Sequence, residues 1–432
     1  MFFLLFFISI SSAFSIEEKI HNEWIQNYMA VSENSSPPKH YRKWIRLARK
    51  HGCSTEPADY KQIFEDLKPF KNEILSIDKI YYEMRKCPSN CPFLEFWDKD
   101  ELIDLSSSFN YKFGNSLIFV SKVLDPNIDF LTITNGYDES IVAPSDDQNI
   151  SEYSYMKDVL QNNKQISRRI GKYSDKCMLL KFPTSFVTIP LKIPIFSVSR
   201  LSGYLDILSP TVRTGLPAYK DHLNTALNST KWNKKKNSAI FRGRTTGIDF
   251  EKARKANVPL TNNPRFKLHE MTMKQKQGKL NCSVELDFGI TDIWQYNDDK
   301  RNYLKILRQY PPSKHLSFEE QFKYKYLVVV DGNSWPDRVA FFLMSGSLVF
   351  LSTLHEEWVI NQLVDGEHYI KVKPDLSDLL DKIEWASRND KLAAKIAQNG
   401  KNLAMNKFGI KQMQLYNALL FMEYQRLFNR TQ

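Results

Sequence analysis

The sequence predicts an α/β protein whose second half contains a mainly parallel, Rossmann-like sheet. From about residue 238 onward, short apolar segments that favour strands alternate with segments of helical periodicity. Two of the strand segments, YLVVV (326–330) and SLVFL (347–351), are apolar throughout. Such strands are typical of a parallel sheet with both faces covered, and strands separated by helices favour right-handed βαβ crossovers.

The other elements follow from the same two periodicities. In the second half we expect helices at 223–232, 263–274, 318–325, 337–345 and 376–389, strands at 238–243, 286–294 and 368–372, and one long final helix. In the first half we expect helices within 16–85 and strands at 117–121, 128–134, 176–182 and 193–199. A Pro- and Gly-marked break at 209–219 suggests a domain boundary.

The chain begins with a short apolar run, MFFLLFFISISSAFS, which resembles a cleaved signal peptide ending near residue 15. A bilayer span needs about 20 apolar residues, so the run is short for a membrane anchor. The usual positive charge at the start is missing, and a buried N-terminal strand or a signal anchor are the alternatives. Sequons for N-glycosylation start at Asn34, Asn149, Asn228, Asn281 and Asn429, which fits passage through the secretory pathway.

The five cysteines allow at most two disulfides, and Cys87 and Cys91 are placed for a short-loop bridge in an oxidising compartment. Histidines are scarce, so we expect no zinc site. Asp298 and Asp299 lie in a polar loop without the strand context of a metal-binding acidic motif.

The net charge of +11 leaves three interpretations open. It can be a solvated basic surface, a site for an anionic ligand such as a nucleotide sugar, or a surface that binds acidic glycans or membranes. Nucleic acid is disfavoured, because no aromatic and basic binding module is visible.

Two strand ends carry candidate binding residues, because ligands of open α/β sheets sit at the carboxyl ends of strands. The first strand ends in Arg242, Gly243 and Arg244. The second is followed by a loop of polar residues and Trp that ends in an arginine before a helix, and we expect that loop to hold a phosphate. Its candidate residues are Asn333, Ser334, Trp335, Pro336, Asp337 and Arg338. The alternative is that Arg338 is a surface cap or pairs with Asp331 or Asp337.

A third candidate lies in the first half, where the strand DFLTIT runs into Asn135-Gly136-Tyr137-Asp138. A carboxylate just past a strand end can serve as a general base facing a cleft. The alternative is an ordinary turn Asp, because Asn-Gly and Asp are typical of turns.

These residues together resemble the protein O-glucosyltransferase group, the Rumi-like or CAP-ten-like glycosyltransferases. The similarity is densest from FKYKYLVVVDGNSWPDRVAFFLMSGSLVFLSTLHEEW to the end of the chain. FRGRTTG, IPIFSVS and the Asn135-to-Val142 stretch, with its Asp138, resemble further motifs of that group in the same order.

The resemblance implies a GT-B architecture, in which two Rossmann-like domains face each other across a cleft and a final helix crosses back. The expected parts are a signal peptide (1–15), an acceptor-side domain (16–208), a donor domain (209–405) and a C-terminal helix (406–432). It also implies a UDP-sugar donor, inversion at the anomeric carbon, and no metal or other cofactor.

Carried over by motif, Asp138 becomes the catalytic base, and Ser197 and Ser199 line the cleft. Arg242, Gly243, Arg244 and the loop from Asn333 to Arg338 hold the donor. The family often has Ser where Arg244 stands. Its second donor-side arginine has no clean match here, and Arg254 is the candidate. Glu139 replaces Asp138 as the base if the register is shifted by one residue.

Three functional hypotheses follow. The first is a secretory-pathway enzyme, a monomer in the ER or Golgi lumen or secreted, that transfers glucose or xylose to a Ser/Thr hydroxyl of a protein or to a glycan hydroxyl. The second is an inactive sugar- or nucleotide-binding member of the same fold, because fold does not decide activity. The third is a basic protein that binds acidic glycans.

Overall fold

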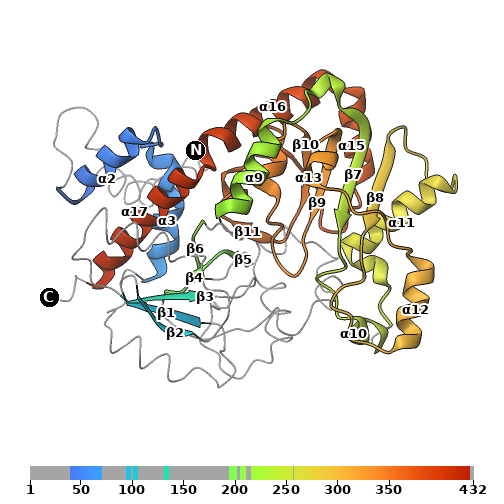
Figure 1. Ribbon diagram of the computed structural model, residues 1–432, viewed down its shortest axis with the longest axis horizontal. Coiled ribbons are helices and arrows are strands. Elements are labelled where there is room, and N and C mark those ends of the chain that lie inside the picture. The colour runs from blue at the N-terminus through green and yellow to red at the C-terminus, as the bar shows by residue number, and fades with distance from the viewer. Residues whose placement is uncertain are drawn as a thin grey trace, which may run out of the picture.

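The computed structural model describes residues 39–70, 94–98, 101–105, 131–135, 194–201, 205–210, 216–255 and 257–428. These residues form a mixed α/β protein with two five-stranded sheets, one from each half of the chain (Figure 1). Within the described residues, no helix is long and apolar enough to cross a membrane.

The sheet of the second half is parallel, as predicted. It contains β7 (Lys236–Gly243), β8 (Glu285–Ile290), β9 (Tyr324–Val330), β10 (Leu348–Ser352) and β12 (Ile370–Lys371). Their spatial order is β12-β10-β9-β7-β8, and every neighbouring pair is parallel. The chain therefore runs from β7 to β8 on one side and returns to place β9 on the other side of β7.

The apolar sequence of β9 is explained by two hydrophobic cores, one on each face of the sheet. Leu327 and Val329 belong to one core, and Tyr326, Val328 and Val330 belong to the other. Side chains of a strand alternate between the two faces, so a strand covered on both sides must be apolar at every position.

The second half also contains helices. They are α9 (Leu216–Leu227), α10 (Phe250–Lys255), α11 (Pro264–Lys276), α12 (Lys300–Gln309), α13 (Phe318–Gln321), α14 (Val339–Met344), α15 (Leu379–Arg388), α16 (Asp390–Lys407) and α17 (Ile410–Phe428). Buried residues of α11, α15 and α16 fill one core, and α14 and α17 contribute to the other.

The sheet of the first half is mixed, with the order β2-β1-β3-β4-β6. Its strands are β1 (Leu94–Asp98), β2 (Glu101–Leu105), β3 (Leu131–Asn135), β4 (Phe196–Ser197) and β6 (Ile207–Leu208). Strand β1 is antiparallel to β2 and β3, whereas β3, β4 and β6 run parallel. The first half also contains helices α2 (Lys39–Lys50) and α3 (Lys61–Leu67).

Several predicted elements differ from the structure, and the helix expected at 318–325 is only α13, with β9 starting at Tyr324. The helix expected at 223–232 is α9, which spans Leu216–Leu227 and ends before the sequon at Asn228. The single final helix is two helices, because the chain breaks at Phe408-Gly409 between α16 and α17. The polar loop at Asp298-Asp299 opens α12, where the Asp299 side chain caps the helix by accepting from the Asn302 N–H at 2.9 Å. The strands expected at 117–121 and 176–182 lie outside the described residues.

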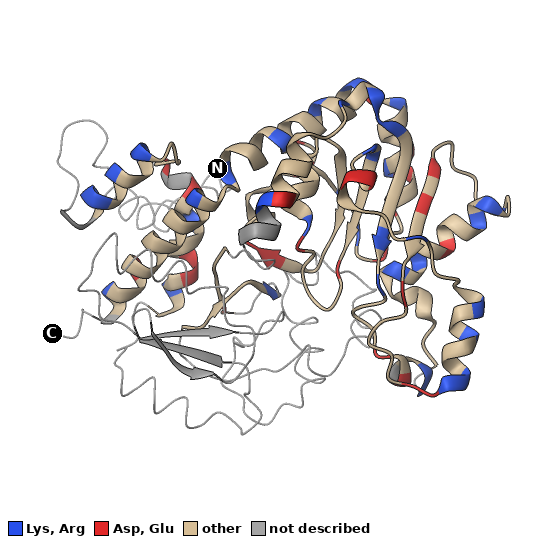
Figure 2. Cartoon of the chain, in the orientation of Figure 1, with Lys and Arg blue, Asp and Glu red and all other residues tan. Residues whose placement is uncertain are grey.

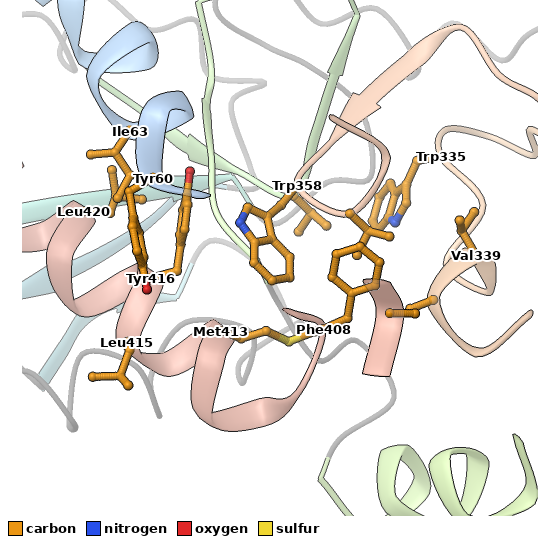
Figure 3. Packing of buried hydrophobic residues seen from close by; sticks show 14 of the residues in the cluster. Tyr60, Ile63, Trp335, Val339, Trp358, Phe408, Met413, Leu415, Tyr416 and Leu420 are labelled. Atoms are coloured by element: carbon orange, nitrogen blue, oxygen red, sulfur yellow. The ribbon is translucent and has the colours of Figure 1, made fainter. Parts of the chain in front are cut away.

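Helix α17 packs against the helices of the first half. The Trp44 indole N–H in α2 donates to the carbonyl of Leu415 at 2.8 Å, and the Tyr60 and Tyr416 rings stack 5.9 Å apart. Figure 3 shows Tyr60 and Tyr416 in a row that continues through Trp358 and Phe408 towards Trp335. One hydrophobic core therefore includes residues from both halves of the chain.

A buried ion triad and a short β-ladder also join the two halves. Asp66 in α3 accepts from Arg200 Nη1 at 2.6 Å, and Arg200 Nε donates to Glu356 at 3.0 Å. The second oxygen of Asp66 accepts from the Leu208 N–H at 2.9 Å. Arg200 lies in β5 (Ser199–Leu201), which pairs antiparallel with β11 (His355–Glu357) of the second half.

Asp66→Ala should destabilise the protein strongly, because it leaves the buried Leu208 N–H without an acceptor and Arg200 with one carboxylate. We expect the free energy of unfolding to fall by about 3–5 kcal/mol in denaturant titrations. The control is Lys61→Ala in the same helix, which breaks the exposed Lys61–Glu65 pair and should cost about 0.5 kcal/mol or less. Equal losses in the two variants would contradict the role of the triad.

Candidate functional site

The carboxyl ends of β7 and β9 border a cavity of about 670 Å³. These neighbouring strands are the place where the strand order reverses, and ligands of open α/β sheets bind in the crevice at such a switch point. The cavity wall includes Arg242, Gly243 and Arg244 after β7, and every residue from Gly332 to Arg338 after β9. The structure thus brings together the two strand ends that the sequence singled out.

The loops after β7 and β9 touch through glycines. Gly247 has a φ of +77°, and a Cβ there would lie 2.0 Å from the carbonyl oxygen of Gly332. The Gly247 N–H donates to Asn333 Oδ1 at 2.8 Å, which joins the two loops directly. A left-handed backbone conformation and this close approach both require glycine at position 247.

Arg338 precedes helix α14, and its side chain reaches from the loop after β9 to the end of β7. Its Nη1 donates to the carbonyl of Arg242 at 2.7 Å, so one guanidinium spans the ends of both strands. Burial lowers the pKa of Arg338, and Asp337 opposes that effect. Asp331 pairs instead with His355, at 3.1 Å, and no carboxylate of the described chain lies within ion-pair distance of Arg338.

Arg265 is a second arginine on the same wall and lies in the first turn of α11. Its side chain is buried. It was not among the residues expected from the sequence. Its Nε donates to the carbonyl of Asp331 at 3.0 Å and its Nη1 to the carbonyl of Arg244 at 2.7 Å. Burial lowers its pKa to about 9, with a further lowering from Arg338, so the group is still a cation at neutral pH. It too has no ion-pair partner among the described residues.

A local signal for Arg265 exists in the sequence. Asn263 caps α11 by accepting from the Arg265 N–H at 2.9 Å, and Pro264 occupies the first turn. Asn-Pro before a helical segment indicates the start of a helix. In an α/β protein the start of a helix lies near the loops at the carboxyl edge of the sheet, so the residue after Asn-Pro is a candidate for that edge.

The structure places Arg254 elsewhere. Its side chain is about half exposed and pairs with Asp298 at 2.6 Å, and Arg254 is not among the residues that line the cavity. Arg265 lines the cavity together with Arg338, whereas Arg254 does not. The place of Arg254 in the sequence, some residues after FRG, does not decide where α10 positions its side chain.

Arg242 and Arg244 take different roles in the cavity wall. The Arg242 guanidinium donates to Asp287 Oδ1 at 2.7 Å and to the carbonyl of Lys314 at 2.9 Å, which holds the neighbouring loop in place. Arg244 is exposed and lies over the Trp294 ring at 4.4 Å. Arg244 can therefore turn towards a ligand, whereas Arg242 is already occupied by the protein.

The remaining candidates in the loop after β9 shape the wall. Ser334 and Trp335 are buried, Pro336 is buried beside them, and Asp337 is exposed. Helix α14 has only six residues, so its N-terminus contributes less to an anion site than the two guanidinium groups do. His222 and Phe318 also line the cavity, with ring centroids 4.7 Å apart.

Other sequence candidates lie away from this wall or outside the described residues. Ser197 is fully buried and donates to Asp206 at 2.5 Å, and Ser199 is buried in β5, so the structure does not bring either serine to the cavity. Asp138, Glu139, Cys87 and Cys91 lie outside the described residues, as do the sequons at Asn34, Asn149 and Asn429. Asn228 and Asn281 are exposed. Among the described residues, no three His, Cys, Asp or Glu side chains gather as metal ligands would.

If the two arginines form an anion site, replacing either one should weaken the binding of inorganic pyrophosphate. We expect Arg265→Gln and Arg338→Gln each to lower the affinity roughly tenfold to a hundredfold in calorimetric titrations, because each removes charged donors. Arg254→Gln is the matched control and should bind like the unmodified protein. Unchanged affinity in both cavity variants would contradict the assignment.

Glu357, in β11, gives a pH dependence that can be tested. Burial and the nearby charge of Asp337 raise its pKa from 4.5 to about 8, although the backbone N–H groups of Ile360 and Val359 oppose the rise. The folded state therefore holds a proton that the unfolded chain releases, and its contribution to stability is lost as pH rises from about 4.5 to about 8.

We expect Glu357→Gln to flatten this fall in the free energy of unfolding, measured by denaturant titration across that pH range. Asp381→Asn, which changes an exposed carboxylate on α15, should keep the slope of the unmodified protein. A Glu357→Gln variant with the original slope would show that another group is responsible.

Comparisons with known proteins show which family the chain belongs to. The family model described as glycosyl transferase family 90 matches residues 184–431, which include the whole parallel sheet. The chain is 32% identical over 197 residues to Protein O-glucosyltransferase 2 of Danio rerio, covering 45% of this chain and 34% of that protein. It is 28% identical over 253 residues to Protein O-glucosyltransferase 1 of Rattus norvegicus, covering 54% of this chain and 57% of that protein.

A similar relation holds with Protein O-glucosyltransferase 3 of Homo sapiens, which is 28% identical over 245 residues, or 54% of this chain and 42% of that protein. The aligned stretch thus spans between a third and three fifths of the length of these relatives. Because the family model matches more than half of its residues, the chain belongs to glycosyl transferase family 90.

Proposed function

We propose that this protein is an inverting glycosyltransferase that moves glucose or xylose from a UDP-sugar to a hydroxyl group of a protein or glycan in the secretory pathway. The observation that carries the proposal is the pair Arg265 and Arg338. Both guanidinium groups face one cavity at the switch point of a parallel sheet, and neither has a carboxylate partner in the described chain.

A nucleoside diphosphate complements this pair. Arg265 is buried and Arg338 is partly buried. Placing both cations there without carboxylate partners is costly, and a diphosphate supplies the negative charge that offsets the cost. A cavity of about 670 Å³ is in the size range of small-molecule sites. Its aromatic lining residues His222 and Phe318 offer contacts for the base, and its arginines offer donors for the phosphates.

The arginines also suit the chemistry of transfer. When the bond between the anomeric carbon and the phosphate oxygen breaks, UDP leaves with the electron pair and gains negative charge. Fixed guanidinium groups at that place stabilise the transition state more than the ground state. The proposed step needs no metal ion, because Arg265 and Arg338 supply the positive charge.

The base belongs to the first half of the chain. Asp138 follows β3 by three residues, and in the proposed GT-B arrangement it faces the donor across the cleft. It takes the proton from the acceptor hydroxyl while the acceptor oxygen attacks the anomeric carbon from the side opposite the phosphate. This displacement inverts the configuration at that carbon.

The relatives are named protein O-glucosyltransferases, and these names favour glucose as the sugar and a protein as the acceptor. The apolar start of the chain favours entry into the secretory pathway. We infer that residues 209–405 bind the donor, that the first half faces the acceptor, and that residues 406–432 cross back to the first half.

The test is a donor panel, with UDP release from UDP-glucose and UDP-xylose measured with and without Ser-containing protein acceptors. We expect acceptor-dependent release with one of the two sugars, and a loss of at least about a hundredfold in kcat for Asp138→Asn, because the general base is removed. Glu139→Gln is the control for the neighbouring carboxylate and should keep its activity.

An Asp138→Asn variant as active as the unmodified protein would refute Asp138 as the catalytic base. Binding of UDP without any transfer would support the inactive member of the fold.

A further inference from the structure

The connection between β8 and α13 carries a basic ridge, and both of its ends line the donor cavity. The chain leaves the cavity wall at Thr291, forms α12, and returns to the wall at His315. The basic ridge consists of the exposed residues Lys300, Arg301, Lys305 and Arg308. The ridge is therefore part of a connection that is anchored to the cavity wall at both ends.

One side of helix α12 packs against the protein, and the other side is exposed to solvent. Its Tyr303, Ile306 and Leu307 side chains join a separate hydrophobic cluster with α10 and α11. The opposite side presents Arg301 and Lys305 to solvent, one helical turn apart. The charges therefore occupy fixed positions on the ridge.

The positive charges of the ridge are not balanced by acidic residues of the same helix. None of its four cations forms an ion pair in the described part of the chain, and the sequence of α12 contains no acidic residue. The carboxylates at its start are already engaged, because Asp299 caps the helix and Asp298 pairs with Arg254. Figure 2 shows α12 with basic residues along it.

An exposed aromatic residue extends this surface to the cavity. The Trp294 side chain is 46% exposed and lies under Arg244, which lines the cavity. Thr245 Oγ1 accepts from the Trp294 N–H at 2.8 Å and donates to its carbonyl at 3.1 Å. The next residue, Gln295, has a φ of +56°, a conformation that non-glycine residues rarely adopt. The backbone therefore holds Trp294 outward at the start of the connection that carries α12.

We propose that the basic ridge, with the Arg244–Trp294 pair, is the docking surface for an acidic polypeptide that carries the acceptor hydroxyl. This inference rests on the proposed function. A polypeptide acceptor must approach the cavity, and unpaired cations on a connection anchored at the cavity wall favour acidic partners and repel basic ones. Trp294 adds an apolar contact at the point where the acceptor meets the donor.

The test measures binding of a fluorescein-labelled peptide with one Ser among Glu and Gly residues, by anisotropy in the presence of UDP. A second peptide has Lys in place of each Glu. We expect the acidic peptide to bind, with affinity that falls as salt is added, and the basic peptide not to bind.

The variant Arg301→Glu/Lys305→Glu should weaken binding of the acidic peptide roughly tenfold or more, because both charges are reversed. The control is Lys391→Glu/Lys395→Glu, which reverses an exposed pair of the same spacing on α16 and should bind the peptide normally. Equal losses in the two variants, or no loss in either, would overturn the proposal.

Two further measurements separate the alternatives. A heparin oligosaccharide that binds the ridge when the acidic peptide does not would overturn the polypeptide partner in favour of an anionic glycan. UDP affinity should be unchanged in the ridge variant, because α12 lies outside the cavity wall. Failure of the unmodified protein to bind UDP would refute the donor site, whereas loss of peptide binding alone concerns only the ridge.

Discussion

The contact between the carboxyl ends of β7 and β9 is the constraint on which the candidate site depends. Gly247 and Gly332 allow the two loops to touch, and a Cβ on Gly332 would lie 2.7 Å from Nη2 of Arg265. The space above Gly332 is therefore taken by the guanidinium of Arg265. Arg338 makes the matching contact from the β9 side to the β7 carbonyl. Two cations are in this way attached to backbone carbonyls and not to carboxylates, which leaves their charge available to an anion.

The rest of the molecule holds this arrangement in place. Trp335, within the loop after β9, lies at the end of the aromatic row that begins with Tyr60 of the first half (Figure 3). The ladder between β5 and β11 and the triad around Arg200 add polar connections between the halves. Packed aromatic side chains and satisfied buried charges resist small displacements, so the donor loop is tied to both halves of the chain. A site built at a strand switch point benefits from such support, because its groups come from distant segments.

Much of this was predictable from the sequence, and the exceptions have physical causes. The parallel sheet, the loop from Asn333 to Arg338 and the β7 end were found because apolar strands and turn residues are local patterns. Arg265 was missed because its place depends on how α11 meets the sheet edge. Two pairings were not predicted: Arg242 pairs with Asp287, and Asp331, the alternative partner for Arg338, pairs with His355. A one-dimensional pattern identifies a charged residue but not the partner that it finds in the folded chain.

By itself, the sequence determined the class of the fold, the order of the elements in the second half and the two strand ends that border the candidate cavity. These properties follow from periodicity and from backbone preferences that act over a few residues. Only the tertiary structure decided which arginines keep an uncompensated charge, that Ser197 is buried, and that both ends of the connection carrying α12 line the cavity. The reason is that burial and charge pairing depend on contacts between residues far apart in the chain, and no local pattern encodes those contacts.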